Sequence, residues 1–167
     1  DLPCDPIAIG PGNTFLDLTD YTLAPEAIVN PSCAANGPLL GDVWLTLHPV
    51  ADCTLEISTC SANGEDPLLE IYTGSCDSIE TTSPIACAEN GASGCSSDDA
   101  QVSVTVSGGS PVLVRVGKRT NGPATTTLSI ECIPASTITL PTASMEQISN
   151  GEVQVAFAEV TVIDSSD

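Results

Sequence analysis

Apolar and polar residues alternate along six segments in the middle of this chain, between Asp42 and Cys132. Each segment is apolar at every second position or throughout, and together they cover residues 42–47, 54–59, 68–72, 101–106, 111–116 and 127–132. A period of two is typical of a β-strand with one buried face, and a continuous apolar run fits a strand buried on both faces. Apolar residues do not recur at helical spacing over a useful length. The pattern therefore predicts an all-β protein with an antiparallel, jelly-roll-like β-sandwich.

Residues 1–41 contain short apolar segments, at 7–9, 14–18 and 27–29, separated by Pro and Gly. We expect one or two lead-in strands here that cover an edge of the sandwich, so that the sandwich domain spans residues 1–132. Five Asn-Gly pairs lie in gaps between the expected strands and favour the positive φ angles of tight turns. They begin at Asn36, Asn63, Asn90, Asn121 and Asn150.

Strand-like sequence continues beyond the sandwich, in residues 133–167. Residues 136–140 alternate, and so do residues 152–162, whose apolar positions change parity near Ala158. A bulge, or a strand that crosses to another sheet or partner, produces such a change. A closed sandwich does not need these strands, so we expect a C-terminal strand extension that a neighbouring subunit can take up. Its interface residues would be Val153, Val155, Phe157, Val160 and Val162.

The composition limits which residues can form the core and which partners the protein can bind. The chain has 167 residues, enough for a real core, but only 3% are aromatic, so aliphatic side chains must fill that core. Three Lys and Arg residues stand against 22 Asp and Glu, which gives a net charge of -19. Such a surface repels phosphate backbones and anionic lipids, so we expect no nucleic-acid or membrane-surface partner. It also repels other copies of the chain unless salt or divalent cations screen it.

Eight cysteines are spread through the chain without a close Cys-x-x-Cys pair for zinc or redox chemistry. Disulfides are the better interpretation, and they place the protein outside the cytosol, in the extracellular space or at the cell surface. We expect a mature secreted chain whose signal has been removed. No apolar run reaches the ~18 residues of a transmembrane helix, so we expect no membrane insertion.

Strand parity suggests one of the disulfides. Cys53 and Cys132 both share the core-facing parity of their strands, so a bridge between them inside the core is geometrically reasonable. The other six cysteines fall into three sets: Cys60 and Cys95 in loops, Cys76 and Cys87 closing a short loop, and Cys4 within reach of Cys33. This arrangement is one of about a hundred that eight cysteines allow.

Several motifs in a fixed order resemble the bacterial pre-peptidase C-terminal domains and their CUB-like relatives. They fall within residues 28–132 and are DVWLTLHP (42–49), CTLEISTC (53–60), DPLLEIYTGSC (66–76), IAC (85–87) and VRVG (114–117). The resemblance implies a jelly-roll-like sandwich in secreted or surface proteins. It also implies an accessory domain that usually does no chemistry itself, appended to proteases or found in long adhesive and structural proteins, sometimes with bound calcium.

Calcium is the best small-ligand hypothesis. This hard cation takes about six to eight oxygen ligands. The candidate ligands lie in loops that the resemblance places near one end of the sandwich, and they are Asp66, Glu89, Asn90, Asp98 and Asp99. The alternative is that these residues are solvated turn residues in a chain that is acidic everywhere.

We expect no enzymatic activity. His48 is the only histidine and precedes Pro49 at a strand end, where a surface position explains it without a general-base role. No serine lies in a Gly-x-Ser-x-Gly elbow. Carboxylates are plentiful, but few aromatic residues are available to stack on a sugar ring. Trp44 is expected in the core, with a sugar-stacking platform as the alternative.

The three basic residues lie within one strand and its following turn, at Arg115, Lys118 and Arg119. In a chain that is otherwise negative, they could dock an acidic surface of another copy. They could equally form a short solvated turn.

These features predict a secreted, non-enzymatic structural or adhesive protein. Its partners would be copies of itself, joined by strand exchange into an extracellular filament or surface assembly. The N-terminal segment could be exchanged instead of the C-terminal one. The alternative function is a calcium-assisted carbohydrate- or protein-binding accessory module, with surface glycans as possible partners.

Overall fold

The chain divides into two units, Asp1–Pro134 and Ala135–Asp167. The computed structural model describes residues 5–22, 39–61, 67–74, 79, 83–91, 95, 99–119, 124–135, 144–147 and 153–156. These residues include no helix that is long and apolar enough to cross a membrane.

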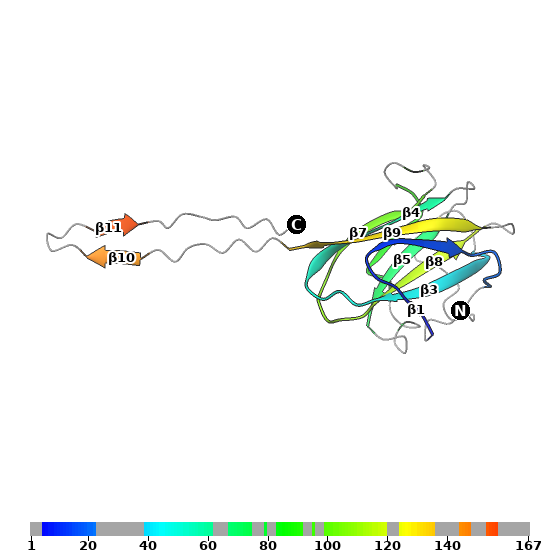
Figure 1. Ribbon diagram of the computed structural model, residues 1–167, viewed down its shortest axis with the longest axis horizontal. Coiled ribbons are helices and arrows are strands. Elements are labelled where there is room, and N and C mark those ends of the chain that lie inside the picture. Colours follow the sequence, from blue (N-terminus) through cyan, green and yellow to red (C-terminus); the bar gives the residue numbers. More distant parts are fainter. Residues whose placement is uncertain are drawn as a thin grey trace. The chain divides into compact units, whose positions relative to one another are not determined.

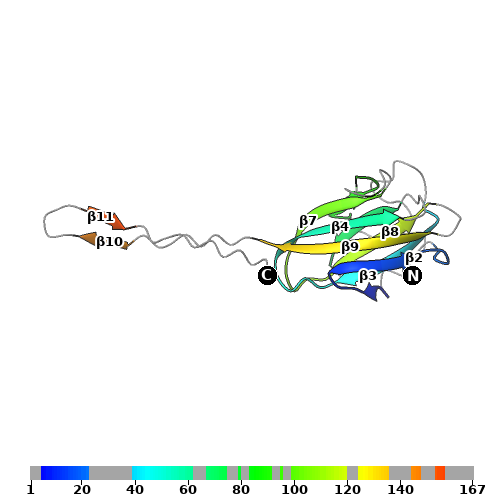
Figure 2. The same ribbon diagram turned by 45° about the horizontal axis from the view of Figure 1, so that its top comes forward.

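The first unit is a sandwich of two β-sheets (Figure 1). Sheet A has the strand order β1-β3-β8-β5-β6. Its strands are β1 (Ile7–Ala8), β3 (Gly41–Leu47), β8 (Val112–Lys118), β5 (Leu68–Thr73) and β6 (Ala86–Ala88). Sheet B has the order β2-β9-β4-β7, which Figure 2 shows from one side. Its strands are β2 (Gly12–Asp17), β9 (Thr125–Pro134), β4 (Cys53–Ser61) and β7 (Gln101–Val106). The predicted all-β sandwich is confirmed, and each of the six predicted strands is present.

The alternation that predicts the strands also explains the core. In sheet B, Leu55, Ile57 and Leu128 occupy every second position of β4 and β9 and are fully buried. They join one hydrophobic cluster with residues of sheet A such as Leu45 and Val114. The central strand β8 is buried along its whole length, as its apolar sequence predicts.

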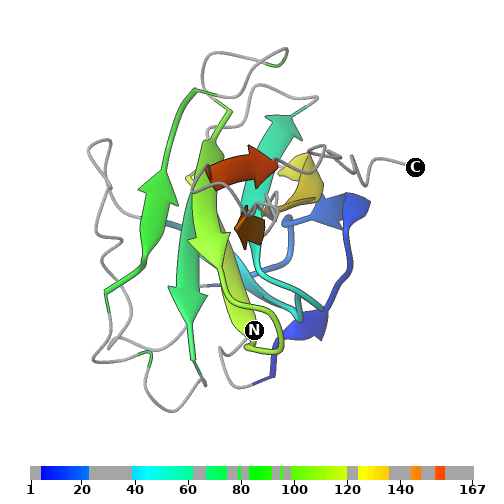
Figure 3. The same cartoon turned by 90° about the vertical axis from the view of Figure 1, so that its left-hand side faces the viewer.

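The N-terminal strands cover one edge of each sheet. β1 runs parallel to β3, with Ile7 opposite Leu45, whereas every other strand pair of the sandwich is antiparallel. The chain then crosses to sheet B, where β2 pairs with β9. Figure 3 shows these two strands in blue along the same side of the sandwich. The expected lead-in strands are therefore present, while residues 27–29 lie outside the described residues.

The Cys53–Cys132 disulfide joins the neighbouring strands β4 and β9, with a Cα–Cα distance of 5.5 Å. Cys53 is 1% exposed and belongs to the core cluster, and Cys132 packs against that cluster. The parity of the two strands predicted this bridge because core-facing residues of adjacent strands meet side by side.

A second disulfide, Cys60–Cys95, ties β4 to the polar segment that precedes β7. Cys60 does not lie in a loop as predicted, because β4 continues to Ser61 along its partner β9. Cys87 is also disulfide-bonded. The remaining cysteines, Cys4, Cys33 and Cys76, lie outside the described residues.

Two glycines mark places where the backbone demands a residue without Cβ. A Cβ at Gly41 would overlap the carbonyl oxygen of Tyr21, because the segment after β2 passes directly against the start of β3. Gly91 has a φ of 102°, the positive value that the Asn90-Gly91 pair predicts. The other four Asn-Gly pairs lie outside the described residues.

The described residues of the second unit form an antiparallel pair, β10 (Ser144–Gln147) and β11 (Val153–Ala156). Met145 lies opposite Val155, and Gln147 lies opposite Val153. The pair forms a two-stranded sheet of its own. Strand structure is thus confirmed for part of residues 152–162, whereas β10 was not predicted. Residues 136–140 and the parity change near Ala158 lie outside the described residues.

Candidate functional site

Sheet A buries a group of polar side chains on the face that points away from the main core. Arg115 of β8 lies opposite Trp44 of β3 on one side and opposite Glu70 of β5 on the other. Asp42 lies two residues from Trp44 on β3, and Tyr72 lies two residues from Glu70 on β5, so both share the face of Arg115. These five residues, the arginine cluster, are each at most 4% exposed.

The arginine cluster is held by short polar contacts. Arg115 Nε donates a hydrogen bond to Oδ2 of Asp42 at 2.7 Å, and Nη1 donates to Oε2 of Glu70 at 2.9 Å. The Tyr72 hydroxyl donates to the same Glu70 oxygen at 3.1 Å. The guanidinium carbon lies 5.4 Å from the centroid of the Trp44 ring. Buried charges are costly unless they are paired and hydrogen-bonded, so these contacts fix β3, β8 and β5 in one register.

The environment of Tyr72 suits a structural role and not acid–base chemistry. Burial, together with the neighbouring charge of Glu70, raises the pKa of the Tyr72 hydroxyl well above its usual 10.0. The hydroxyl therefore keeps its proton and remains a hydrogen-bond donor to Glu70. A general acid or base needs a pKa near the working pH and contact with a substrate, and the buried Tyr72 fits neither condition.

The side chains of the other two basic residues are also little exposed. Lys118, which is 5% exposed, donates from Nζ to the carbonyl oxygen of Thr19 at 2.6 Å. The side chain of Arg119 is 7% exposed and pairs with Glu89. Arg115, Lys118 and Arg119 are all the Lys and Arg residues of the chain. The prediction that they dock a neighbouring copy is wrong, because groups inside their own sandwich already bind them.

The predicted calcium ligands are only partly described. Asp66 and Asp98 lie outside the described residues. Glu89 is paired with an arginine, Asn90 is exposed and Asp99 is fully buried. Calcium binding at these residues stays a prediction.

One group of three potential metal ligands occurs within the described ranges, formed by Cys60, Cys95 and Asp99. Its two sulfur atoms are joined in a disulfide. Metal-binding cysteines coordinate as thiolates, which a disulfide does not provide. This group is therefore part of the cross-link that anchors the segment before β7.

The outer face of sheet B is accessible and mostly uncharged, unlike the outer face of sheet A, which carries the buried arginine cluster. One row across its four strands consists of Asn13, Ser129, Ser58 and Gln101. The next row places Glu56 opposite Glu131, a like-charge pair that is unfavourable on a sheet. Phe15, on the edge strand β2, is 68% exposed. Hydroxyl, amide and aromatic groups on one open face can hydrogen-bond and stack with a polar ligand.

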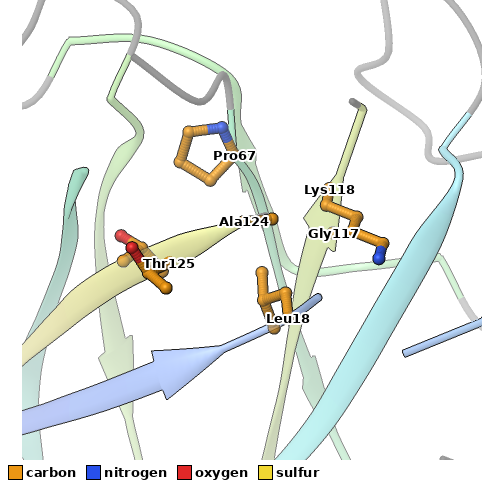
Figure 4. A pocket seen from close by; sticks show the side chains of 7 residues that line it. Leu18, Pro67, Gly117, Lys118, Ala124 and Thr125 are labelled. Carbon is orange, nitrogen blue, oxygen red and sulfur yellow. The ribbon is translucent and has the colours of Figure 1, made fainter. Parts of the chain in front are cut away.

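A small pocket lies between the ends of β2, β8 and β9 (Figure 4). Its lining residues are Leu18, Pro67, Gly117, Lys118, Ala124, Thr125 and Thr126. The pocket is too narrow to admit a water molecule. It is a packing gap beneath the Lys118 contact and offers no space for a ligand.

The edge strands of the two sheets differ in length. In sheet A, β1 and β6 have two and three residues. In sheet B, β2 and β7 have six residues each. A long edge strand can pair with another chain through its outward backbone groups unless charge, Pro or a bulge prevents it. The edges of sheet B are therefore candidate interaction sites, and the sequence did not reveal them because alternation does not give strand order.

The predicted interface residues of the C-terminal extension are divided by what the structure describes. Val153 and Val155 lie in β11, at alternate positions of a strand. Phe157, Val160 and Val162 lie outside the described residues. Their role in an interface stays a prediction.

The fold has known counterparts. No protein-family model matches the chain, and no curated protein matches it in sequence. The pre-peptidase C-terminal domain of a collagenase from Bacillus anthracis is similar in structure, with a TM-score of 0.52 and 14% identity over 78% of this chain and 99% of that one. A family 6 carbohydrate-binding module gives a TM-score of 0.37 and 15% identity over 77% and 99% of the two chains. The resemblance read from the sequence motifs is thus confirmed as a fold shared with the pre-peptidase C-terminal domain.

Proposed function

With a sandwich of the pre-peptidase C-terminal fold as the premise, we propose that this protein is a secreted, non-catalytic structural protein that associates with copies of itself. The C-terminal unit of one copy pairs with the sandwich of the next. A contact of this head-to-tail kind builds a filament or surface assembly when its rotation does not close. The observation that carries the proposal is the β10–β11 pair, which forms a two-stranded sheet of its own.

The stability of short hairpins supports this proposal. β10 and β11 have four residues each, and a lone two-stranded hairpin is marginally stable in water. Pairing with the edge of a larger sheet adds main-chain hydrogen bonds and buries alternate side chains. Pairing with an external sheet therefore stabilises the second unit more than it stabilises the sandwich, since the sandwich already has two layers and a core.

The disulfides support an extracellular location. Both described bridges lie within the first unit, at Cys53–Cys132 and Cys60–Cys95. Disulfides persist in oxidising compartments and are reduced in the cytosol. They also restrict the unfolded chain, which suits a protein that must last outside the cell.

Truncation tests the proposed function. Sedimentation velocity of the full chain should show concentration-dependent assembly, whereas a chain that ends at Pro134 should sediment as a folded monomer. Assembly of the truncated chain to the same extent as the full chain would rule out exchange of the C-terminal unit. It would favour a contact made by the sandwich alone.

Salt dependence provides a second test. The net charge is -19, and the side chains of all three basic residues are little exposed, so approaching copies repel one another. Assembly of the full chain should therefore become stronger as sodium chloride rises from about 10 mM to about 150 mM, because the Debye length falls from ~30 Å to ~8 Å. Assembly that weakens with added salt would contradict the role given to the acidic surface.

A second candidate function is binding of carbohydrate or protein ligands, assisted by calcium. The observation that favours it is the exposed face of sheet B, where Phe15 borders a row of hydroxyl and amide side chains. Glycan-array binding by the monomeric chain, with and without calcium, tests this candidate. Phe15→Ala should abolish such binding, and Ile7→Ala, which removes an exposed apolar residue from sheet A, should not. No array signal above background would remove the carbohydrate version.

A further inference from the structure

From the edges of the sandwich we infer which strand receives the C-terminal unit of a second copy: β7, at residues 102–106, pairs with β11. The inference rests on the proposed strand exchange and adds the acceptor site. Its partner is a second copy of this chain. It can fail while the exchange itself holds.

The position of β7 makes it a possible acceptor. β7 is the last strand of sheet B and pairs with β4, with Val104 opposite Leu55 and Val106 opposite Cys53. On its other side, Gly91 forms a single bridge with Ala100, just before the strand begins. The six residues of β7 are enough to pair with all four residues of β11, whereas β1 and β6 are too short.

The charge pattern of the strands distinguishes β7 and β11 from the others. Among the described strands of four or more residues, these two alone contain no Asp, Glu, Lys or Arg. The net charge of the chain is -19, so most contacts between two copies bring like charges together. Pairing of two uncharged strands avoids that cost in the contact itself.

The three valines of β7 differ in how far they are buried. Val102, Val104 and Val106 occupy the core-facing positions, and Val102 and Val106 are 5% and 4% exposed. Val104 lies between them but is only partly buried, while Leu55 opposite it is fully buried. An added strand would cover Val104. β11 has valine at alternate positions, 153 and 155, as β7 does, so the two patterns can match in register.

The other long edge strand of sheet B, β2, is a poorer acceptor. Its core-facing residue at position 14 is a polar threonine, and its only exposed large apolar residue, Phe15, is on the opposite face. Asp17 adds a carboxylate at one end of the strand. Natural edge strands often carry charges that prevent pairing with other chains.

Matched substitutions in the full chain test the acceptor. Val104→Glu on β7 and Thr14→Glu on β2 each place a carboxylate at a core-facing, partly buried position of an edge strand. Strand addition at β7 would bury the new carboxylate of Val104→Glu, so self-association measured by sedimentation should weaken by about tenfold or more. Thr14→Glu should assemble as the parent chain does.

A second pair of substitutions repeats the test without altering the core. Thr105→Glu and Asn13→Glu change exposed residues of β7 and β2. Thr105→Glu should weaken assembly and Asn13→Glu should not, and thermal unfolding should show that both variants are folded. This pair decides the result if Val104→Glu fails to fold.

The outcomes separate the acceptor from the exchange. If both β7 variants assemble like the parent while truncation at Pro134 abolishes assembly, then β7 is not the acceptor but the proposed function stands. If the β2 variants alone lose assembly, β2 is the acceptor and the inference is overturned. If the truncated chain assembles, both the inference and the proposed function fall.

Discussion

The sandwich and the C-terminal unit contain similar alternating sequences but stabilise them differently. In the sandwich, apolar residues of β4 and β9 face those of sheet A, and a disulfide joins the same two strands. In the second unit, β10 and β11 pair with each other in a sheet of two strands. An alternating sequence therefore predicts a strand with one apolar face but does not say which sheet covers that face. A strand whose apolar face or edge is not covered by its own sheet can pair with another copy.

The largest effect is expected from the arginine cluster. Arg115→Ala leaves the buried carboxylates of Asp42 and Glu70 without their cation, so the sandwich should lose about 3–5 kcal/mol of unfolding free energy. Urea unfolding followed by the fluorescence of Trp44, the only tryptophan, measures this loss. A loss below about 1 kcal/mol would mean that the cluster does not hold the sheet together.

The next effect is that of the disulfides. Replacing Cys53 and Cys132 by alanine removes a bridge between residues 79 positions apart, and it should destabilise the sandwich by about 2–5 kcal/mol. Replacing Cys60 and Cys95, which are 35 positions apart, is the matched control. This replacement should lower the unfolding free energy by less, since the Cys60–Cys95 bridge closes a shorter loop. An equal or larger loss in the control would show that native-state packing, and not loop length, sets the order.

Strand alternation was sufficient to predict the sandwich because its central strands are long and aliphatic. β6 and β10 were missed because they are short and poor in large apolar residues, as in Ala86-Cys87-Ala88. Parity predicted the Cys53–Cys132 bridge because both residues face the core. It did not place Cys60, since a strand's end depends on how far its neighbour continues.

The sequence did not reveal the arginine cluster or the edges of sheet B. Arg115 occupies a position that alternation assigns to the outer face, and only strand order shows that Trp44 and Glu70 are its neighbours. The basic residues of an acidic chain therefore left two interpretations open, a docking surface and a solvated turn, although groups of their own sandwich bind all three side chains. Which strands lie at the edges of a sheet also depends on strand order, which alternation does not give.

A smaller effect is expected from Tyr72 at high pH. Its pKa is raised in the folded sandwich, so the stability that the protonated hydroxyl contributes is complete below about pH 10 and is lost as the pH rises further. Each pH unit in that range should cost up to about 1.4 kcal/mol from this one group. Unfolding free energies from pH 8 to 11 should fall less steeply for Tyr72→Phe than for the parent chain. Parallel profiles would show that Tyr72 ionises equally well in the folded and unfolded states.

Amide hydrogen exchange of the full chain, measured at several chain concentrations, tests strand exchange most directly. Amides of β7 and β11 should gain protection together as assembly rises, whereas those of β2 should not change. Assembly without added protection in either strand would contradict the account, and so would protection of β11 that is already complete in the most dilute sample.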